Sequence, residues 1–181
     1  NAGLISSVFS DSVILDLSPP TGSIAINNNA VYTNSTSVTL TLTATDTISD
    51  VYQVALSNDG VWDTEPWETP ILTKTWTLPS TEGTNMVYYR IKDNAGLISN
   101  VYTDVIILDL SPPTGSITIN NNAIYTNTTT VTLDLSATDT ISDIAEMRFS
   151  NDNITYTAWQ AYTTSKSWTL DEGDGTKTAY V

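Results

Sequence analysis

The chain has 181 residues without Cys or His, and its formal net charge is −14 at pH 7. These features exclude disulfides and thiol chemistry, and a surface this negative would repel nucleic acid and anionic membranes. We therefore expect no nucleic-acid partner. No apolar run is long enough to span a bilayer, so we expect no membrane insertion. The location that we expect is extracellular or at the cell surface.

The first half of the chain is expected to consist of short strands separated by turns. Residues 21–26 are predicted to form a strand that ends at the turn-prone Asn27-Asn28-Asn29. Residues 38–45 alternate between apolar residues and Thr, which predicts a half-buried strand with its threonines in water. Further strands are expected at 52–56, 74–78, 86–92 and 101–110. Since no stretch has a helical period, the prediction is an all-β fold, an antiparallel β-sandwich of about seven strands.

The second half of the chain repeats the first. Residues 16–24 return as 109–117, and residues 44–50 return as 137–143, in each case 93 residues further on. A period of this length corresponds to a complete small domain and not to one turn of a solenoid. We therefore expect tandem β-sandwich modules arranged as a rod.

The repeat divides the chain into three parts. The prediction is a complete module at 18–110 and a second module at 111–181 that lacks its last strand. Residues 1–17 match 94–110, so they are predicted to be the terminal strand of a preceding or neighbouring module. Either the chain is a segment of a longer array, or residues 1–17 of one subunit add a strand to the second module of the next. Head-to-tail repetition of such strand addition would give a filament.

Six motifs characterise the modules: Ser18-Pro19-Pro20-Thr21-Gly22-Ser23-Ile24, Tyr32-Thr33-Asn34, Ala44-Thr45-Asp46, Ser57-Asn58-Asp59-Gly60, Lys92-Asp93-Asn94-Ala95-Gly96 and Lys166-Ser167-Trp168-Thr169-Leu170. On these residues the chain resembles the immunoglobulin-like repeats of large bacterial and archaeal cell-surface and secreted proteins. The resemblance covers essentially the whole chain, and it is specific for the type of module but not for its function. Such modules serve as spacers, adhesin stalks, surface-layer units and accessory domains of glycan-degrading enzymes.

Two functions stay open at this point. The first is a non-catalytic structural repeat of an extracellular filament, surface layer or adhesin stalk, whose partners are copies of itself arranged head-to-tail. The alternative is an accessory module of a secreted carbohydrate-active enzyme, which would bind glycans or cell wall. We expect no active site within the chain, because carboxylate pairs are the remaining acid–base groups and its aspartates fall in duplicated turns.

Aspartates recur where the modules would join. In an immunoglobulin-like sandwich the loops after the second and sixth strands lie at one pole, beside the entry of the chain. Asp16, Asp46, Asp50 and Asp93 are therefore expected to gather at one junction. The matching set at the next junction is Asp109, Asp139 and Asp143. Carboxylate oxygens are hard ligands, and the chain has no His or Cys to offer softer ones, so the pattern predicts Ca²⁺ at the module junctions. The competing interpretation is that these aspartates only cap turns.

Two further groups of residues are candidates for contact with carbohydrate. Trp62 and Trp67 lie in an irregular acidic stretch, so they are candidate glycan contacts, although packing at a sheet edge is the competing interpretation. Asn34, Asn127 and Asn153 each begin a match to the N-glycosylation acceptor pattern. In a chain so rich in Asn and Thr, such matches are also expected by chance.

Overall fold

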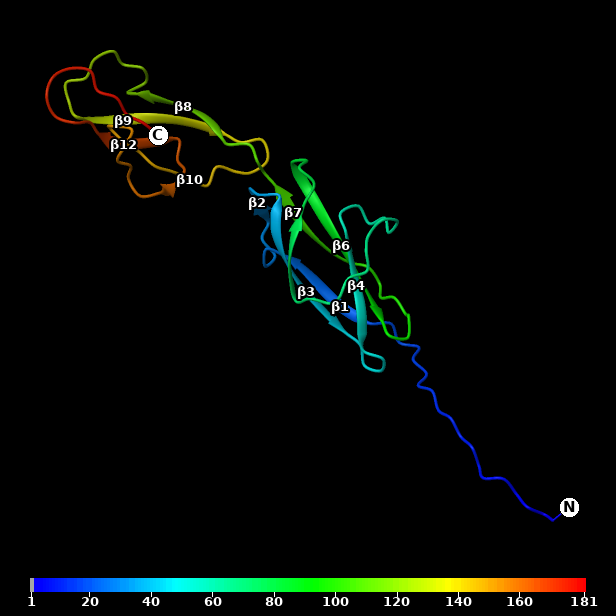
Figure 1. The fold of residues 1–181 in the computed structure, drawn as a ribbon. Coiled ribbons are helices and arrows are strands. Elements are labelled where there is room, and N and C mark those ends of the chain that lie inside the picture. Colours follow the sequence, from blue (N-terminus) through cyan, green and yellow to red (C-terminus); the bar gives the residue numbers. More distant parts are fainter. Residues whose placement is uncertain (1) are drawn as a thin grey trace. The chain divides into compact units, whose positions relative to one another are not determined.

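The fold is all-β, as the sequence predicts. The computed structural model describes residues 2–181, which form strands, turns and loops and no helix (Figure 1). These described residues therefore contain no helix that is long and apolar enough to cross a membrane. The chain divides into two compact units: unit 1 runs to Leu108, and unit 2 is Asp109–Val181.

Two sheets form unit 1. One sheet has the order β1-β3-β5 and the other the order β2-β7-β6-β4, and all neighbouring strands are antiparallel except β2 and β7. With β1, β3 and β5 in one sheet and β4, β6 and β7 in the other, the strands are distributed as in an immunoglobulin-type sandwich. The strands are β1 (Thr21–Ile26), β2 (Tyr32–Thr33), β3 (Ser37–Thr45), β4 (Val51–Ser57), β5 (Thr73–Thr77), β6 (Gly83–Asp93) and β7 (Tyr102–Leu108).

Alternating apolar residues build the core of unit 1. In β3 the side chains of Val38, Leu40 and Leu42 are buried, and the threonines between them are exposed. Both sheets contribute to this core, which also contains Ile24, Ile26, Val54, Leu56, Leu78, Val87, Tyr89, Ile91 and Ile106. The period-two pattern thus identified the inward face of the strand correctly.

A run of asparagines turns the chain after β1. Asn27, Asn28 and Asn29 all have positive φ angles, of 46°, 56° and 62°. Asn tolerates this left-handed conformation better than most residues. The side-chain Oδ1 of Asn27 accepts a hydrogen bond of 2.8 Å from the backbone N–H of Thr39, which extends the pairing of β1 with β3. The equivalent bond in unit 2 joins Asn120 to the N–H of Thr132 at 2.8 Å.

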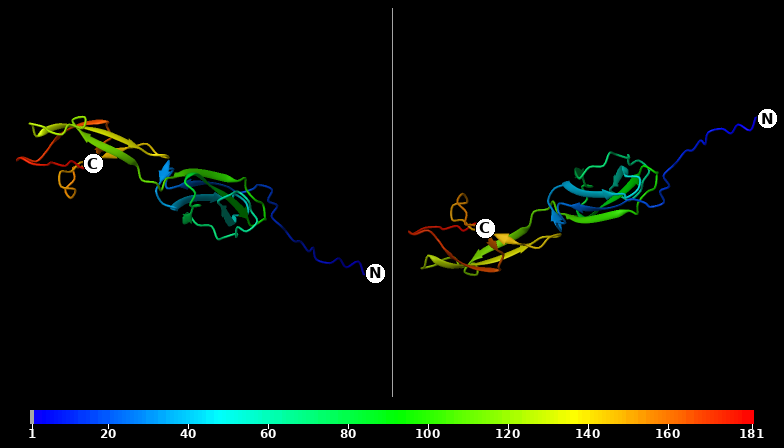
Figure 2. Two further views of the ribbon diagram at one scale, coloured as in Figure 1. Left: turned by 90° about the horizontal axis from the view of Figure 1, so that it is seen from above. Right: turned by 90° about the horizontal axis from the view of Figure 1, so that it is seen from below.

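Unit 2 repeats the first sheet of unit 1. The order β12-β9-β8 corresponds to β5-β3-β1 (Figures 1 and 2). Thr114 pairs with Thr138 as Thr21 pairs with Thr45. The opposite face of unit 2 carries the two-stranded sheet of β10 and β11, and an isolated bridge joins Ser150 to Tyr180. The strands are β8 (Thr114–Ile119), β9 (Thr130–Thr138), β10 (Glu146–Met147), β11 (Gln160–Ala161) and β12 (Ser165–Thr169).

Residues 2–17 form no strand with the rest of the chain. Residue 1 of the terminal strand predicted at 1–17 lies outside the described part of the chain. Apart from Asp16, residues 2–17 are exposed, and the exposed set includes large apolar side chains: Leu4, Ile5, Val8, Phe9, Val13, Ile14, Leu15 and Leu17.

Candidate metal centre

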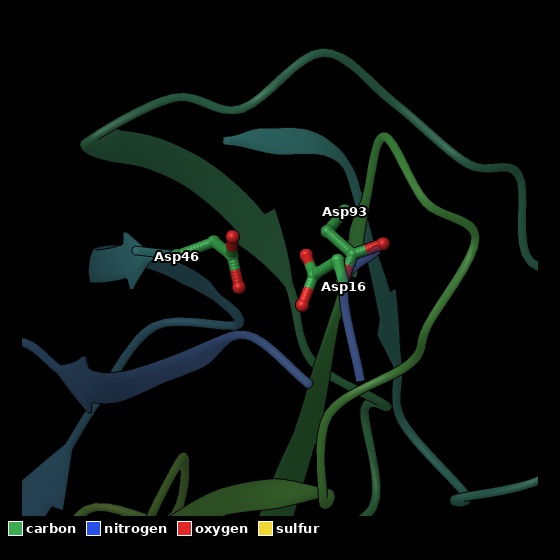
Figure 3. A group of neighbouring side chains, drawn as sticks. All are labelled: Asp16, Asp46 and Asp93. Atoms are coloured by element: carbon green, nitrogen blue, oxygen red, sulfur yellow. The ribbon is translucent and has the colours of Figure 1, made fainter. Parts of the chain in front are cut away.

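Three of the predicted aspartates come together in unit 1. One carboxylate oxygen each from Asp16, Asp46 and Asp93 lies within 4.8 Å of the other two (Figure 3). Asp16 lies in the segment before β1, Asp46 follows the last residue of β3, and Asp93 is the last residue of β6. The three side chains are far apart in sequence, and the meeting of these strand ends at one pole of the sandwich brings them together.

Asp93 is the most deeply buried of the three, with none of its surface exposed. Its Oδ1 accepts a hydrogen bond of 2.8 Å from the backbone N–H of Leu97, inside the tight turn that follows β6. The backbone carbonyl of Asp93 accepts a bond of 3.2 Å from the N–H of Gly96 in the same turn. The other carboxylate oxygen, Oδ2, is buried without a hydrogen-bond partner.

Asp16 has the same pattern. Its side chain is 8% exposed, and its Oδ1 accepts a hydrogen bond of 2.9 Å from the backbone N–H of Ser18. Its Oδ2 is buried without a partner. Leaving a charged, buried oxygen without a partner costs more than the roughly 1–3 kcal/mol of a neutral polar group. Two such oxygens lie within one group of carboxylates, and a cation between them would satisfy both.

Asp46 is held in place by its own turn. Its Oδ1 accepts hydrogen bonds from the backbone N–H groups of Ile48, at 2.9 Å, and Ser49, at 2.8 Å. The hydrogen bond from Ile48 lowers the pKa of Asp46 most, and the bond from Ser49 has the next largest effect. This carboxylate is therefore charged at neutral pH. The side chain of Asn94 donates a bond of 2.7 Å to the carbonyl of Ser49, which ties this turn to the turn after β6.

The group is electrostatically unfavourable without a counter-ion. The hydrogen bonds to its Oδ1 atoms come from backbone N–H groups and not from Lys or Arg. At an effective dielectric constant of about 20, two unit charges about 4.8 Å apart repel each other by roughly 3.5 kcal/mol. Three carboxylates form three such pairs, so a divalent cation between them would replace repulsion by attraction.

The geometry and the donor atoms suit calcium. Ca²⁺ takes roughly 6–8 oxygen ligands at about 2.3–2.6 Å, so two ligands of one ion lie at most about 5 Å apart. The separation of 4.8 Å or less satisfies this condition. Backbone carbonyls and water are the usual additional ligands of such sites. Asp16, Asp46 and Asp93 are therefore the residues that would hold the ion.

Asp50 does not belong to the group, although it was predicted with it. Its side chain is exposed, and its φ angle of 59° turns the backbone just before β4. Asp50 supports the site only indirectly, through its backbone carbonyl, which accepts a hydrogen bond of 3.2 Å from the N–H of Asn94. Asp50 thus helps to join the two turns that carry Asp46 and Asp93.

The predicted set in unit 2 is organised by local turns. Asp109 accepts a bond of 3.2 Å from the N–H of Ser111, as Asp16 does from Ser18. Asp139 accepts bonds from two backbone N–H groups, of which that of Ile141 contributes most to lowering its pKa. Asp143 is exposed. Within the described residues 109–181, these carboxylates do not form a group of three, and turn capping accounts for Asp109 and Asp139.

Trp62 and Trp67 pack against cations of their own unit. The guanidinium carbon of Arg90 lies 4.0 Å from the ring centre of Trp62 and 4.9 Å from that of Trp67. The ammonium group of Lys92 lies 4.2 Å from the ring centre of Trp67. Both indoles are half-buried, and these cation–π contacts use ring surface that a sugar would need.

Unit 2 has a second aromatic cluster, and sequence reasoning did not single out the arginine at its centre. The guanidinium of Arg148 lies 4.6 Å from the ring centre of Tyr156 and 4.7 Å from that of Trp159. Arg148 corresponds to Ala55 at the repeat offset, so the duplication gave no signal for it. Its cation–π contacts depend on the three-dimensional approach of the loop that carries the aromatic residues.

The three predicted glycosylation sites lie on the surface. Asn34, Asn127 and Asn153 are all exposed. The Oδ1 of Asn153 accepts a hydrogen bond of 2.6 Å from the hydroxyl of Tyr156, and its φ angle is 59°. Attachment of a glycan at these positions stays a prediction.

The fold and the carboxylate group define an all-β protein with an immunoglobulin-type sandwich and a candidate divalent-cation site. No protein-family model and no curated protein matches the chain. Among solved structures, the chain is similar to the PKD1 domain of Vibrio anguillarum Epp, with 14% sequence identity and a TM-score of 0.37. The alignment covers 51% of this chain and 98% of that domain.

Proposed function

We propose that the chain is a non-catalytic structural part of an extracellular filament, surface layer or adhesin stalk, and that Ca²⁺ stabilises unit 1. One observation carries the calcium part of this proposal. The buried Oδ2 atoms of Asp16 and Asp93 have no hydrogen-bond partner and belong to one group with the carboxylate of Asp46. A bound divalent cation would satisfy all three side chains.

The duplicated residues support a structural role. In unit 1 the indole N–H of Trp76 donates a hydrogen bond of 2.7 Å to the side chain of Asn58. In unit 2 the indole N–H of Trp168 donates the equivalent bond, of 2.6 Å, to Asn151. These repeated pairs join a turn to a strand, so the repeated sequence maintains the sandwich. A glycan-binding role has less support, because cations already cover Trp62 and Trp67.

An extracellular location is compatible with calcium binding at this group. Calcium-binding modules outside the cell have dissociation constants of about 10⁻⁴–10⁻³ M, and more rigid or more highly charged sites bind more tightly. The formal net charge of −14 adds long-range attraction for cations. Both features suit a protein that works where calcium is abundant.

Calcium titration by calorimetry tests the proposal on the 181-residue chain. We expect one strong site per chain, and at least a tenfold loss of affinity in Asp93→Asn. The matched control is Asp139→Asn, which removes a similar turn-capping carboxylate from unit 2 and should leave the strong site unchanged. Absence of a strong site, or equal affinity in wild type and Asp93→Asn, would refute calcium binding at this group.

A further inference from the structure

A serine hydroxyl is buried in the turn that carries Asp46. Ser49 lies between β3 and β4, and its backbone N–H donates a hydrogen bond of 2.8 Å to the Oδ1 of Asp46. The side-chain Oγ of Ser49 is buried and has no hydrogen-bond partner. A hydroxyl can both donate and accept hydrogen bonds, and buried polar atoms nearly always have a partner. The orphaned Oγ therefore needs a physical explanation.

The orphaned atoms of the molecule gather at one pole of unit 1. Among residues 2–181, four buried side-chain polar atoms have no hydrogen-bond partner. Three of them are oxygens at this pole: Oδ2 of Asp16, Oδ2 of Asp93 and Oγ of Ser49. The fourth is the Nε of Arg90, whose guanidinium packs against the ring of Trp62. Each of the three oxygens has a lone pair to offer, so a single cation would satisfy all of them.

Ser49 is fixed between the turns that carry Asp46 and Asp93. Its N–H is bonded to the carboxylate of Asp46, and its carbonyl accepts a bond of 2.7 Å from the side chain of Asn94, the residue after Asp93. The N–H of Ile48 lowers the pKa of Asp46 most, and the Ser49 side chain makes the smallest contribution. That contribution places the hydroxyl close to the Asp46 carboxylate, which in turn faces the carboxylate of Asp16 (Figure 3).

The three carboxylates leave room for further ligands. The Oδ1 atoms of Asp16, Asp46 and Asp93 already accept hydrogen bonds from backbone N–H groups, so each side chain offers mainly its second oxygen. Calcium takes roughly 6–8 oxygen ligands, more than these side chains supply. A neutral hydroxyl adds a ligand without adding to the repulsion among the carboxylates, which a fourth aspartate would do.

We propose that the Oγ of Ser49 is a fourth protein ligand of the calcium ion held by the three aspartates. This inference rests on the proposed function and adds a residue to the same site. The hydroxyl would bind the ion through a lone pair, and its proton would remain available to a carboxylate oxygen. Burial of the atom, which is costly without a partner, is then explained by the ion that it contacts.

The repeat supplies a matched control for Ser49. Ser142 corresponds to it at the offset of 93 residues, and the N–H of Ser142 donates a bond of 3.0 Å to the Oδ1 of Asp139 in the same kind of turn. The Oγ of Ser142 is not one of the buried atoms without a partner. The carboxylates near it do not form a group of three within the described residues 109–181. A substitution of Ser142 therefore repeats the change in side chain away from the proposed ligand group.

The first test is removal of each hydroxyl in the full chain. By calorimetric titration, Ser49→Ala should bind calcium roughly fivefold to tenfold more weakly than the wild type, because one ligand is lost. Ser142→Ala should bind it as tightly as the wild type. Both variants keep the backbone N–H that holds the neighbouring aspartate, so this contact does not change. In chelator, the unit 1 transition of Ser49→Ala should lie at or above that of the wild type, because the variant no longer buries an orphaned hydroxyl.

The second test exchanges the hydroxyl for a thiol, since soft sulfur ligands favour soft metals over calcium. The natural chain has no Cys, so Ser49→Cys introduces a single thiol. Cadmium is a softer ion of similar size. The cadmium concentration that displaces half of the calcium bound at the strong site, measured by equilibrium dialysis, should fall by roughly tenfold or more relative to the wild type. In Ser142→Cys this concentration should not change, because the thiol lies outside the strong site.

Three results would overturn the assignment of Ser49. One is equal calcium affinity in Ser49→Ala and the wild type. Another is a lower melting temperature of Ser49→Ala in chelator with an unchanged calcium shift, which would give the hydroxyl a purely structural role. The third is an unchanged preference for cadmium in Ser49→Cys. If Asp93→Asn nevertheless weakens calcium binding, the role of Ser49 alone is rejected, whereas a wild-type chain without a strong site rejects the proposed calcium binding as well.

Discussion

Removing calcium should lower the melting temperature of unit 1 and leave that of unit 2 unchanged. A ligand that binds only the folded state, at 100 times its dissociation constant, adds about 2.7 kcal/mol to the free energy of unfolding. For a domain of roughly 60–100 residues, each 1 kcal/mol moves the melting temperature by about 4–8 °C. Excess chelator should therefore lower the melting temperature of unit 1 by roughly 10–20 °C relative to saturating calcium.

Differential scanning calorimetry on the full chain measures this effect. The two units have separate cores, so two transitions are expected. Leu133→Ala identifies the transition of unit 2, because it truncates a fully buried side chain there and should cost about 2–5 kcal/mol. The reasoning is wrong if the unit 1 transition has the same midpoint in chelator and in calcium, or if calcium moves both transitions equally.

Two variants sharpen the same experiment. Asp93→Asn should abolish the calcium shift, and in chelator it should melt above the wild type because it removes two of the three repulsive charge pairs. Asp50→Asn is the matched control, since this exposed side chain is outside the group and contributes through its backbone carbonyl. It should retain the full calcium shift.

Three further predictions concern the turns and the aromatic clusters. A serine hydroxyl lowers the pKa of Asp59, and backbone N–H groups lower that of Asp152. The stability that these two carboxylates add above pH 3.8 should therefore be lost as the pH falls further. Asp→Asn at either position should weaken the dependence of the urea unfolding midpoint on acid pH. Trp76→Phe and Trp168→Phe should each cost about 1 kcal/mol in their own unit by urea unfolding, because each removes an indole hydrogen bond. Arg90→Ala should cost about 1–2 kcal/mol and shift tryptophan fluorescence to the red, because two indole rings lose their cation.

Local periodicity predicted the strands that have a polar and an apolar face. β3 is the clearest case, because alternate Thr residues label its exposed side along the whole strand. β2 was not predicted: it has two residues, and its pairing with β7 joins positions such as Tyr32 and Ile107 that are far apart in the chain. No periodicity exists in two residues, so only the tertiary structure reveals such a strand.

The candidate metal site was predictable to the extent that it depends on strand ends. Asp46 and Asp93 lie at the ends of strands that an immunoglobulin-type sandwich brings to one pole. Asp50 lies four residues beyond Asp46, but its positive φ angle belongs to a turn that exposes its side chain. The contacts of Trp62 with Arg90 were also beyond the sequence, because they join a loop to a distant strand.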